Sequence, residues 1–259
     1  MAEASDSPGG PWRTHDVPSG EELEIRVGPL GIRVREHAGE VHLSHRLEGE
    51  PAPADRGEWA RFAPASWNRS LTLRPAFPDR TVIVAPDDPF RLLEGAEARV
   101  YVRLPLVAVV EVEGRAAPAT LARIPTYRYS DTWWGVHTEG ELCYWLPTHA
   151  RREMRPELFE DHLAVCPLQL MNRSESDLDV EKIAFRATFL SLYRKGRRLW
   201  SDETRVRYRG EAEGSSLDMA GGPPGEEPDA ELVLPPRERM ARGFRSRTFA
   251  RIRSLHPWT

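Results

Sequence analysis

Three carboxylates of this chain, Asp131, Glu139 and Glu141, stand beside its most aromatic segment, where six of the nineteen residues from 127 to 145 are aromatic. Two carboxylates next to rings that can stack on a sugar form the arrangement with which a glycosidase cleaves a glycosidic bond. A carbohydrate-active protein, either glycan-binding or glycoside-hydrolysing, is therefore one hypothesis for this segment. In a simpler interpretation, which we favour, Asp131 starts a turn and the two glutamates are solvated residues around Gly140.

Aromatic side chains bury large areas, so this segment is either part of a β core or the wall of a ligand groove. Successive side chains of a strand point to opposite faces, so Trp133 and Trp134 cannot both point into one core, and neither can Tyr144 and Trp145. We therefore predict that one ring of each pair lies at a surface or between two sheets. The predicted ligand-binding residues are Tyr129, Trp133, Trp134, Glu139, Glu141 and Trp145.

The same segment carries a resemblance to a known family. Residues 129–145 read YSDTWWGVHTEGELCYW, residues 166–174 read CPLQLMNRS, and the short stretches LDVEKI, LSLY and LW follow from Leu178, Leu190 and Leu199. Over roughly residues 125–210 the chain resembles a prokaryotic family catalogued as domain of unknown function 432. The resemblance implies an all-β domain without an established activity, and it supplies no catalytic residues.

Other familiar chemistry finds little support in the residue pattern. Among the eight histidines only His37, His42 and His45 are close in sequence, and His42 and His45 face opposite sides of an extended strand, so we predict no metal site and no cofactor. Neither a G-x-S-x-G nucleophile turn nor a glycine-rich phosphate loop nor an H-E-x-x-H motif is present. The sequence therefore predicts no catalytic residues and favours a non-catalytic binding or interaction module.

The two cysteines, Cys143 and Cys166, are separated by 23 positions on predicted neighbouring strands. In a cytoplasmic protein we expect both to be buried free thiols rather than a disulfide. The apolar neighbours of Cys143 should raise the pKa of its thiol instead of activating it.

Short stretches in which apolar and polar residues alternate recur along the chain, separated by Gly, Pro, Asp and Asn. This pattern is typical of half-buried antiparallel strands, and long helical periodicity is nearly absent. The sequence therefore predicts an all-β protein built from one or two antiparallel β-sandwiches with short helical turns. The predicted strands are Leu23–Val27, Ile32–Arg35, Val41–Leu47, Leu71–Leu73, Thr81–Val84, Arg99–Leu104, Val107–Val112, Leu142–Leu146, Leu163–Met171, Leu178–Ala187, Leu190–Tyr193 and Thr204–Tyr208.

Two other segments do not alternate in this way. Glu48–Ala65 is rich in Pro, Ala and charge, and we predict a loop that Trp59 and Phe62 attach to the body. Arg151–Asp161, with Pro156 near its start, predicts a short helix or helical turn.

Composition divides the chain into four predicted ranges: an N-terminal β region (1–124), a β-sandwich region with the family-like motifs (125–209), an acidic Gly/Pro linker (210–234) and a basic tail (235–259). Residues 211–231 hold seven acids and no base, whereas residues 235–259 hold seven arginines and one acid. Opposite charges in neighbouring blocks indicate either a tail that folds back over the acidic segment or a tail that stays available for an anionic partner.

From Pro236 onward, apolar residues at steps of three and four predict a C-terminal helix with arginines on its other faces, and a strand is the competing interpretation. Such a basic surface suits nucleic acid, an anionic membrane or an acidic protein. We favour the alternative in which the apolar side of the tail contacts the protein's own body. The predicted contact residues of the tail are Arg242, Arg245, Arg247, Arg251 and Arg253.

Three further features set limits on the class of protein. The chain contains 34 arginines and two lysines, a bias that indicates a GC-rich coding sequence more than phosphate binding. No apolar run reaches the about 18 residues that a membrane-spanning helix needs. The first ten residues have neither the basic head nor the apolar stretch of a secretory signal, so we expect a cytoplasmic protein.

Overall fold

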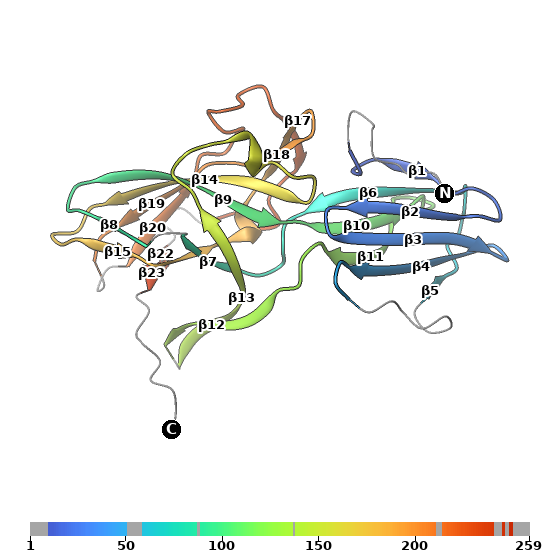
Figure 1. The fold of residues 1–259 in the computed structure, drawn as a ribbon, viewed down its shortest axis with the longest axis horizontal. Coiled ribbons are helices and arrows are strands. Elements are labelled where there is room, and N and C mark those ends of the chain that lie inside the picture. Colours follow the sequence, from blue (N-terminus) through green and yellow to red (C-terminus); the bar gives the residue numbers. More distant parts are fainter. Residues whose placement is uncertain are drawn as a thin grey trace.

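Strands, most of them antiparallel, make up most of the chain that the structure describes (Figure 1). The structure is a computed structural model, and it describes residues 10–50, 59–86, 89–136, 138–210, 214–240, 245–246 and 249–250. Within these residues the only helical elements are two 3-10 turns, η1 (Pro156–Leu158) and η2 (Ala187–Phe189). The prediction of an all-β protein is therefore confirmed.

The N-terminal part of the chain forms two four-stranded sheets, with strand orders β2-β3-β4-β5 and β1-β6-β10-β11. In the first sheet alternate side chains are buried, as the sequence pattern predicted for half-buried strands. Ala38 and Gly39, both with positive φ, make the tight turn between β3 and β4. The strands are β1 (Thr14–Asp16), β2 (Glu22–Val27), β3 (Leu30–His37), β4 (Glu40–Leu47), β5 (Ala60–Phe62), β6 (Ser70–Ala76), β10 (Val107–Val112) and β11 (Ala119–Pro125).

The other strands form a five-stranded sheet, β12-β13-β7-β16-β23, and an eight-stranded sheet, β21-β17-β18-β14-β19-β20-β22 with β9 paired to β14. A two-stranded sheet, β15-β8, accompanies them. Most pairs are antiparallel, but β13 runs parallel to β7, and β14 runs parallel to β18 and β19. The strands are β7 (Val82–Pro86), β8 (Phe90–Leu92), β9 (Glu97–Pro105), β12 (Ser130–Val136), β13 (Glu139–Ala150), β14 (Leu163–Asn172), β15 (Leu178–Val180), β16 (Lys182–Phe185), β17 (Leu192–Lys195), β18 (Arg198–Ser201), β19 (Thr204–Tyr208), β20 (Ser215–Met219), β21 (Glu231–Leu234), β22 (Arg245–Ser246) and β23 (Phe249–Ala250).

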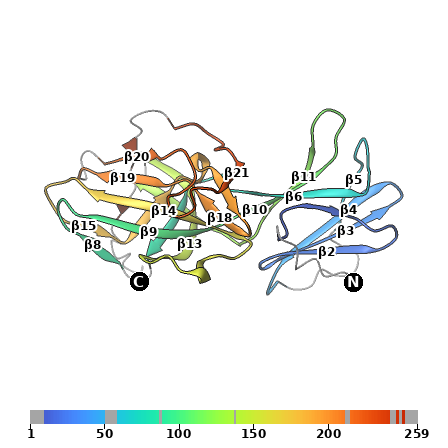
Figure 2. The ribbon, with the colours of Figure 1, turned by 90° about the horizontal axis from the view of Figure 1, so that it is seen from above.

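One nearly continuous strand run joins the two groups of sheets, which lie side by side along the long axis of the molecule (Figure 2). β9 pairs with β14, and β10, which begins two residues after β9 ends, pairs with β6 and β11. At the junction the Leu106 amide donates to the His162 carbonyl at 2.9 Å, and the Thr126 hydroxyl donates to the Leu106 carbonyl at 2.6 Å. Leu106 and Thr126 are fully buried, so the backbone polar groups at this crossing are satisfied internally.

A second contact between the two groups lies beside this junction. The Trp12 indole Nε1 donates to the Asp161 carbonyl at 2.6 Å, and the Asp161 carboxylate is paired with Arg197. Gly28, in the β2–β3 turn with φ of 56°, lies against the His162 ring. A Cβ atom at position 28 would come within 2.2 Å of His162 Nδ1, so this close approach needs glycine.

The strand pairing runs across the predicted range boundary at residue 124. β7 pairs with β13, and β9 pairs with β14, although both β7 and β9 lie before residue 124. The predicted linker range, 210–234, contains β20 and β21, which belong to the eight-stranded sheet. The division of the chain into ranges stays a prediction.

The acidic segment binds to basic residues of the body. Three of its carboxylates form ion pairs with side chains of the eight-stranded sheet. The Glu226 carboxylate also accepts a hydrogen bond of 2.6 Å from the Tyr101 hydroxyl, which holds it against β9. The pairs are Glu226 with Arg99, Glu227 with Arg198 and Asp229 with Lys195.

The two segments without alternation contain short elements. Residues 151–161 include η1, the short helical turn that the sequence predicted. Residues 48–65, predicted to be a loop, include β5, and the Arg35 guanidinium lies over the Trp59 ring at 4.2 Å from its centroid. Among the described residues no helix is long and apolar enough to cross a membrane.

The contact at Gly28 predicts that an alanine will destabilise the fold much more at Gly28 than at Gly20, although both glycines have positive φ. Gly20→Ala, where the added Cβ meets nothing within 4 Å, should lower the free energy of unfolding by about 1 kcal/mol, because only the left-handed backbone opposes it. Gly28→Ala should lower it by about 2 to 4 kcal/mol, because the Cβ also clashes with the His162 ring. Urea unfolding of both variants measures the difference, and equal losses would contradict this close approach.

Candidate functional site

The predicted aromatic segment forms the hairpin of β12 and β13, whose register assigns its side chains to two faces. Asp131, Trp133, Leu142 and Tyr144 lie on the face that continues into Val82 and Val84 of the main core, here called the core-side face. Thr132, Trp134, Glu141, Cys143 and Trp145 lie on the opposite, second face. Figure 1 shows the turn end of the hairpin extending away from the sheets.

Two large apolar side chains are exposed side by side on the core-side face. Trp133 is 52% exposed and Leu142 is 46% exposed, and the two residues are direct partners across the hairpin. The Trp133 ring lies on Gly140, where a Cβ atom would come within 2.3 Å of its Nε1. Gly140 therefore lets the indole lie close against the hairpin backbone with about half of its surface open to solvent.

Closer to the body, the core-side face carries a tyrosine stack. The rings of Tyr129 and Tyr144 are stacked with centroids 4.6 Å apart, and Tyr127 meets Tyr129 edge-on at 5.7 Å. The Tyr129 hydroxyl donates to the Pro105 carbonyl at 2.8 Å, and burial raises the pKa of Tyr129. The stack therefore belongs to the packed body, and the exposed part of this face is at Trp133 and Leu142.

The polar groups near the tyrosine stack are paired with one another. Arg80 Nη1 lies 3.1 Å from Asp131 Oδ1, and its guanidinium lies over the Tyr144 ring at 5.1 Å. The Tyr144 hydroxyl donates to Asp79 Oδ1 at 2.9 Å, and burial and this hydrogen bond raise the pKa of Tyr144. Asp131 is thus engaged with a cation at the edge of the exposed apolar pair.

The second face of the hairpin is largely closed. Trp134 and Cys143 are buried with Ile83 and Ala184 in a small cluster, and half-buried Trp145 packs against it. The Lys182 ammonium lies 5.1 Å from the centroid of the Trp145 ring. As the alternation of strand residues predicted, Trp133 is exposed while Trp134 is buried; Tyr144 and Trp145 lie on opposite faces, and both are half-buried.

Glu141 is engaged in an ion pair on the second face. Its carboxylate pairs with Arg186, and the Thr81 hydroxyl donates to Glu141 Oε2 at 3.1 Å. Asp131 and Glu141 lie on opposite faces of the hairpin, so these two carboxylates do not flank one bond. Glu139 pairs with Val136 through its backbone, and its side chain lies outside the described residues.

Several side chains of the site were not found by reasoning on the sequence. Leu142 was predicted as a strand residue, but its exposure follows from how far the hairpin extends beyond the core. Thr81, Arg80 and Arg186 reach the hairpin because β7 pairs with both β13 and β16. No local motif signals these three residues, because their positions depend on long-range strand pairing.

Only part of the basic tail lies among the described residues, and its first residues contact the body: the Glu238 amide donates to the Thr188 carbonyl at 3.0 Å, and Met240 packs against the main core. Arg242, Arg247, Arg251 and Arg253 lie outside the described residues, as does most of the predicted helix. Of Arg245 only the backbone is described; it belongs to β22, which pairs with β20. The other described strand of the tail, β23, pairs with β16.

The histidines and carboxylates of the described chain form no group of three that could hold a metal ion. His37 and His42 do approach each other, with ring centroids 5.7 Å apart on neighbouring strands β3 and β4. His42 Nε2 is 3.2 Å from Glu40 Oε2, and the same carboxylate binds Arg61. Glu40 is thus already bound by the Arg61 guanidinium and the His42 imidazole.

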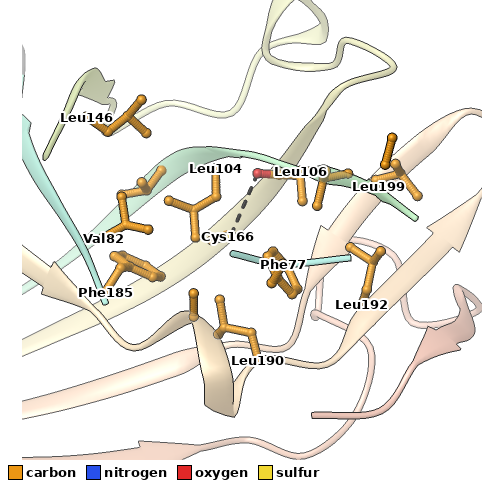
Figure 3. Close-up of a cluster of buried hydrophobic side chains, with 14 of the residues drawn as sticks. Phe77, Val82, Leu104, Leu106, Leu146, Cys166, Phe185, Leu190, Leu192 and Leu199 are labelled. Atoms are coloured by element: carbon orange, nitrogen blue, oxygen red, sulfur yellow. Dashed lines mark hydrogen bonds between the residues drawn. The ribbon is translucent and has the colours of Figure 1, made fainter. Parts of the chain in front are cut away.

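Both cysteines are free and buried, as the sequence predicted. Cys166 lies in the apolar core among residues that include Leu104, Phe77 and Phe185 (Figure 3), and its thiol donates to the Ala164 carbonyl at 3.7 Å. Burial raises the pKa of Cys166 to about 12 and that of Cys143 to about 11. Neither thiol is poised as a nucleophile, because the thiolate is the reactive form.

Asp202, between β18 and β19, is a buried carboxylate close to Cys166. It is 2% exposed and accepts a hydrogen bond of 3.0 Å from the Ser191 backbone amide. Burial raises the pKa of Asp202 from 3.8 to about 6. The Ser201 hydroxyl donates to the Asp202 carbonyl at 2.7 Å, so this polar group connects β18, β19 and the start of β17 inside the body.

Comparison with known proteins supports the resemblance noted in the sequence. A family model described as "Protein of unknown function (DUF432)" matches residues 11–253. The match extends well beyond residues 125–210 and includes both N-terminal sheets, for which the sequence had shown no resemblance. No curated protein and no solved structure matches the chain.

The burial of both thiols predicts slow modification. Ellman's reagent should release no thionitrobenzoate from the native protein on the timescale of mixing and two equivalents after denaturation, because both thiols are buried and protonated. A Ser130→Cys variant, at an exposed position of β12, is the control and should add one equivalent that reacts at once. Rapid reaction of either native thiol would contradict the packing described.

Asp202 predicts a characteristic dependence of stability on pH. The native pKa of about 6 lies above the unfolded value of 3.8, so the native state binds the proton more tightly, and this contribution to stability is full below about pH 4 and is lost as pH rises to 6. The Asp202→Asn substitution removes this pH-dependent contribution to stability. Relative to wild type, the free energy of unfolding of the variant should rise by about 2 kcal/mol between pH 4 and pH 7.

Urea unfolding at a series of pH values measures this gain. Asp218→Asn, at an exposed position of β20, is the control and should follow the wild-type profile. Parallel profiles of Asp202→Asn and wild type would show that the buried carboxylate does not titrate in this range.

Proposed function

We propose that this chain, which belongs to the DUF432 family of proteins of unknown function, is a non-catalytic protein-interaction module whose working surface is the exposed part of the core-side face of the β12–β13 hairpin. The observation that carries the proposal is the exposure of Trp133 and Leu142 side by side on a face that elsewhere packs into the main core. Adjacent large apolar side chains at the surface of a protein are typical of interaction sites.

The carboxylates of the segment support a non-catalytic role. A glycosidase needs two carboxyl groups on either side of one bond, and Asp131 and Glu141 lie on opposite faces of the hairpin. Both are also held in ion pairs, with Arg80 and Arg186 respectively. An acid or nucleophile at either position would first have to leave its cationic partner.

The surroundings of Trp133 favour a protein partner over a glycan. Sugar recognition combines a stacking ring with polar groups that fix the hydroxyls. Here the neighbour in direct register is Leu142, and the nearby Asp131 is engaged with Arg80. An apolar pair with charged groups at its edge matches the apolar core and polar rim of a protein interface.

Further proposals concern architecture and location. We propose that the two N-terminal sheets pack face to face as a β-sandwich, which is supported by the single buried cluster to which both contribute, for example through Ile25 and Val110. We also propose a cytoplasmic location, which two free cysteines support because disulfides are rare in that compartment. A basic tail that binds an anionic partner stays a prediction from the sequence.

Selection of peptides tests the proposed interaction surface. Peptides selected by phage display on the full chain should lose at least tenfold in affinity for Trp133→Ala, because the ring supplies the central apolar contact. Leu93→Ala is the matched control, since Leu93 is 59% exposed in the turn after β8, and it should bind as wild type does.

Three outcomes would overturn this function. Peptides that bind Trp133→Ala as well as wild type would place the interaction elsewhere. Binding on a glycan array that Trp133→Ala abolishes, without selectable peptides, would assign the same surface to glycans, and turnover of glycosides that Glu141→Gln removes would establish an enzyme.

A further inference from the structure

We propose that β12 is a self-association edge, at which the five-stranded sheet of one copy pairs with that of a second copy about a two-fold axis at Trp133. This inference rests on the proposed function and names its partner, a second copy of this chain. The pairing would join two sheets through antiparallel β12 strands.

The position of β12 in its sheet makes this pairing possible. In the part of the chain that the structure describes, β12 is the outermost strand of the order β12-β13-β7-β16-β23. An outermost strand is a template for a strand of another chain, and proteins usually protect it with charges, prolines or short length. β12 has seven residues, Ser130–Val136, with one charge and no proline.

Two-fold symmetry fits the order of residues in β12. Trp133 is the central residue of the seven, so an antiparallel pair centred there sets Trp133 opposite its own copy. Asp131 then faces Gly135 of the second copy, and the only charged residue of the strand meets no like charge. A parallel pair in register would set Asp131 opposite Asp131, which is unfavourable.

The exposed apolar side chains of the hairpin become continuous in this arrangement. Leu142 is the direct partner of Trp133 across the hairpin, so the two-fold axis creates a row of four apolar side chains on one face, Leu142 and Trp133 from each copy. Residues directly opposite on an antiparallel pair lie about 5 Å apart at Cβ, so the two Trp133 residues stand side by side, each with its ring over Gly140 of its own hairpin. The pairing therefore joins the apolar side chains that each chain leaves open into one continuous apolar surface.

Disulfide trapping tests the register directly. Trp133→Cys should give a covalent dimer under mild oxidation, because opposite Cβ atoms in this register are near the separation of a disulfide. Ser130→Cys is the control and should stay monomeric, since it would lie about 20 Å from its copy in the same arrangement. Both native cysteines are buried, so they contribute no competing thiol.

Sedimentation velocity from low to high micromolar concentration tests association of the unmodified chain. Wild type should show a concentration-dependent monomer–dimer equilibrium. Trp133→Lys should be monomeric, because two lysines would face each other across the axis, whereas Leu93→Lys, a substitution at a remote exposed leucine, should dimerise as wild type does.

The outcomes separate this inference from the proposed function. A wild-type chain that is monomeric throughout, together with no Trp133→Cys dimer, overturns the pairing, and Trp133-dependent peptide binding would then still support the interaction surface. Dimers that form equally in wild type and Trp133→Lys also overturn it, because the contact would lie elsewhere. If neither dimers nor Trp133-dependent peptide binding is observed, both proposals are overturned.

Discussion

The strand run from β9 to β10 is the constraint on which the rest of the structure depends, because one stretch of backbone belongs to both groups of sheets. Leu106, between the two strands, has no ladder partner of its own within either sheet, and its amide and carbonyl are satisfied by His162 and Thr126. A buried unsatisfied amide would cost about 1 to 3 kcal/mol, so these bonds allow the chain to pass from one group to the other without leaving the core. Both groups of sheets are thereby oriented by the same residues.

The same constraint explains how the hairpin obtains its partly open face. Tyr129 lies just before β12, and its hydroxyl donates to the Pro105 carbonyl at the end of β9. The hairpin therefore starts from the junction, its base packs on the core through Tyr144, and its far end reaches beyond the core with Trp133. The attachment of Tyr129 to Pro105 therefore holds the base of the hairpin on the body and leaves its far end uncovered.

Much of the fold could be predicted from the sequence, because strand periodicity is a local property. Alternation identified strands such as β4 and β14, and it required Trp133 and Trp134 to face opposite ways. It could not tell which ring would be covered, since that depends on β7 lying parallel to β13. The charge pattern met the same limit: the two opposite blocks left open whether the tail folds back over the acidic segment or stays available for an anionic partner. Neither alternative indicated that Glu226 would be bound by Arg99, which is far away in sequence and close in the fold.

The fixed position of Trp133 distinguishes it from an incidental exposed side chain. A mobile surface side chain loses about 0.5 to 1.5 kcal/mol of rotamer freedom when a partner immobilises it. The Trp133 ring already lies on Gly140, where no Cβ atom would fit, so part of this entropy was lost when the hairpin formed. Its open surface is then available at a lower cost than that of Leu93, an exposed side chain in a turn. Gly140 thus connects the fold to the proposed interaction surface, because a side chain at that position would lift the ring from the strand.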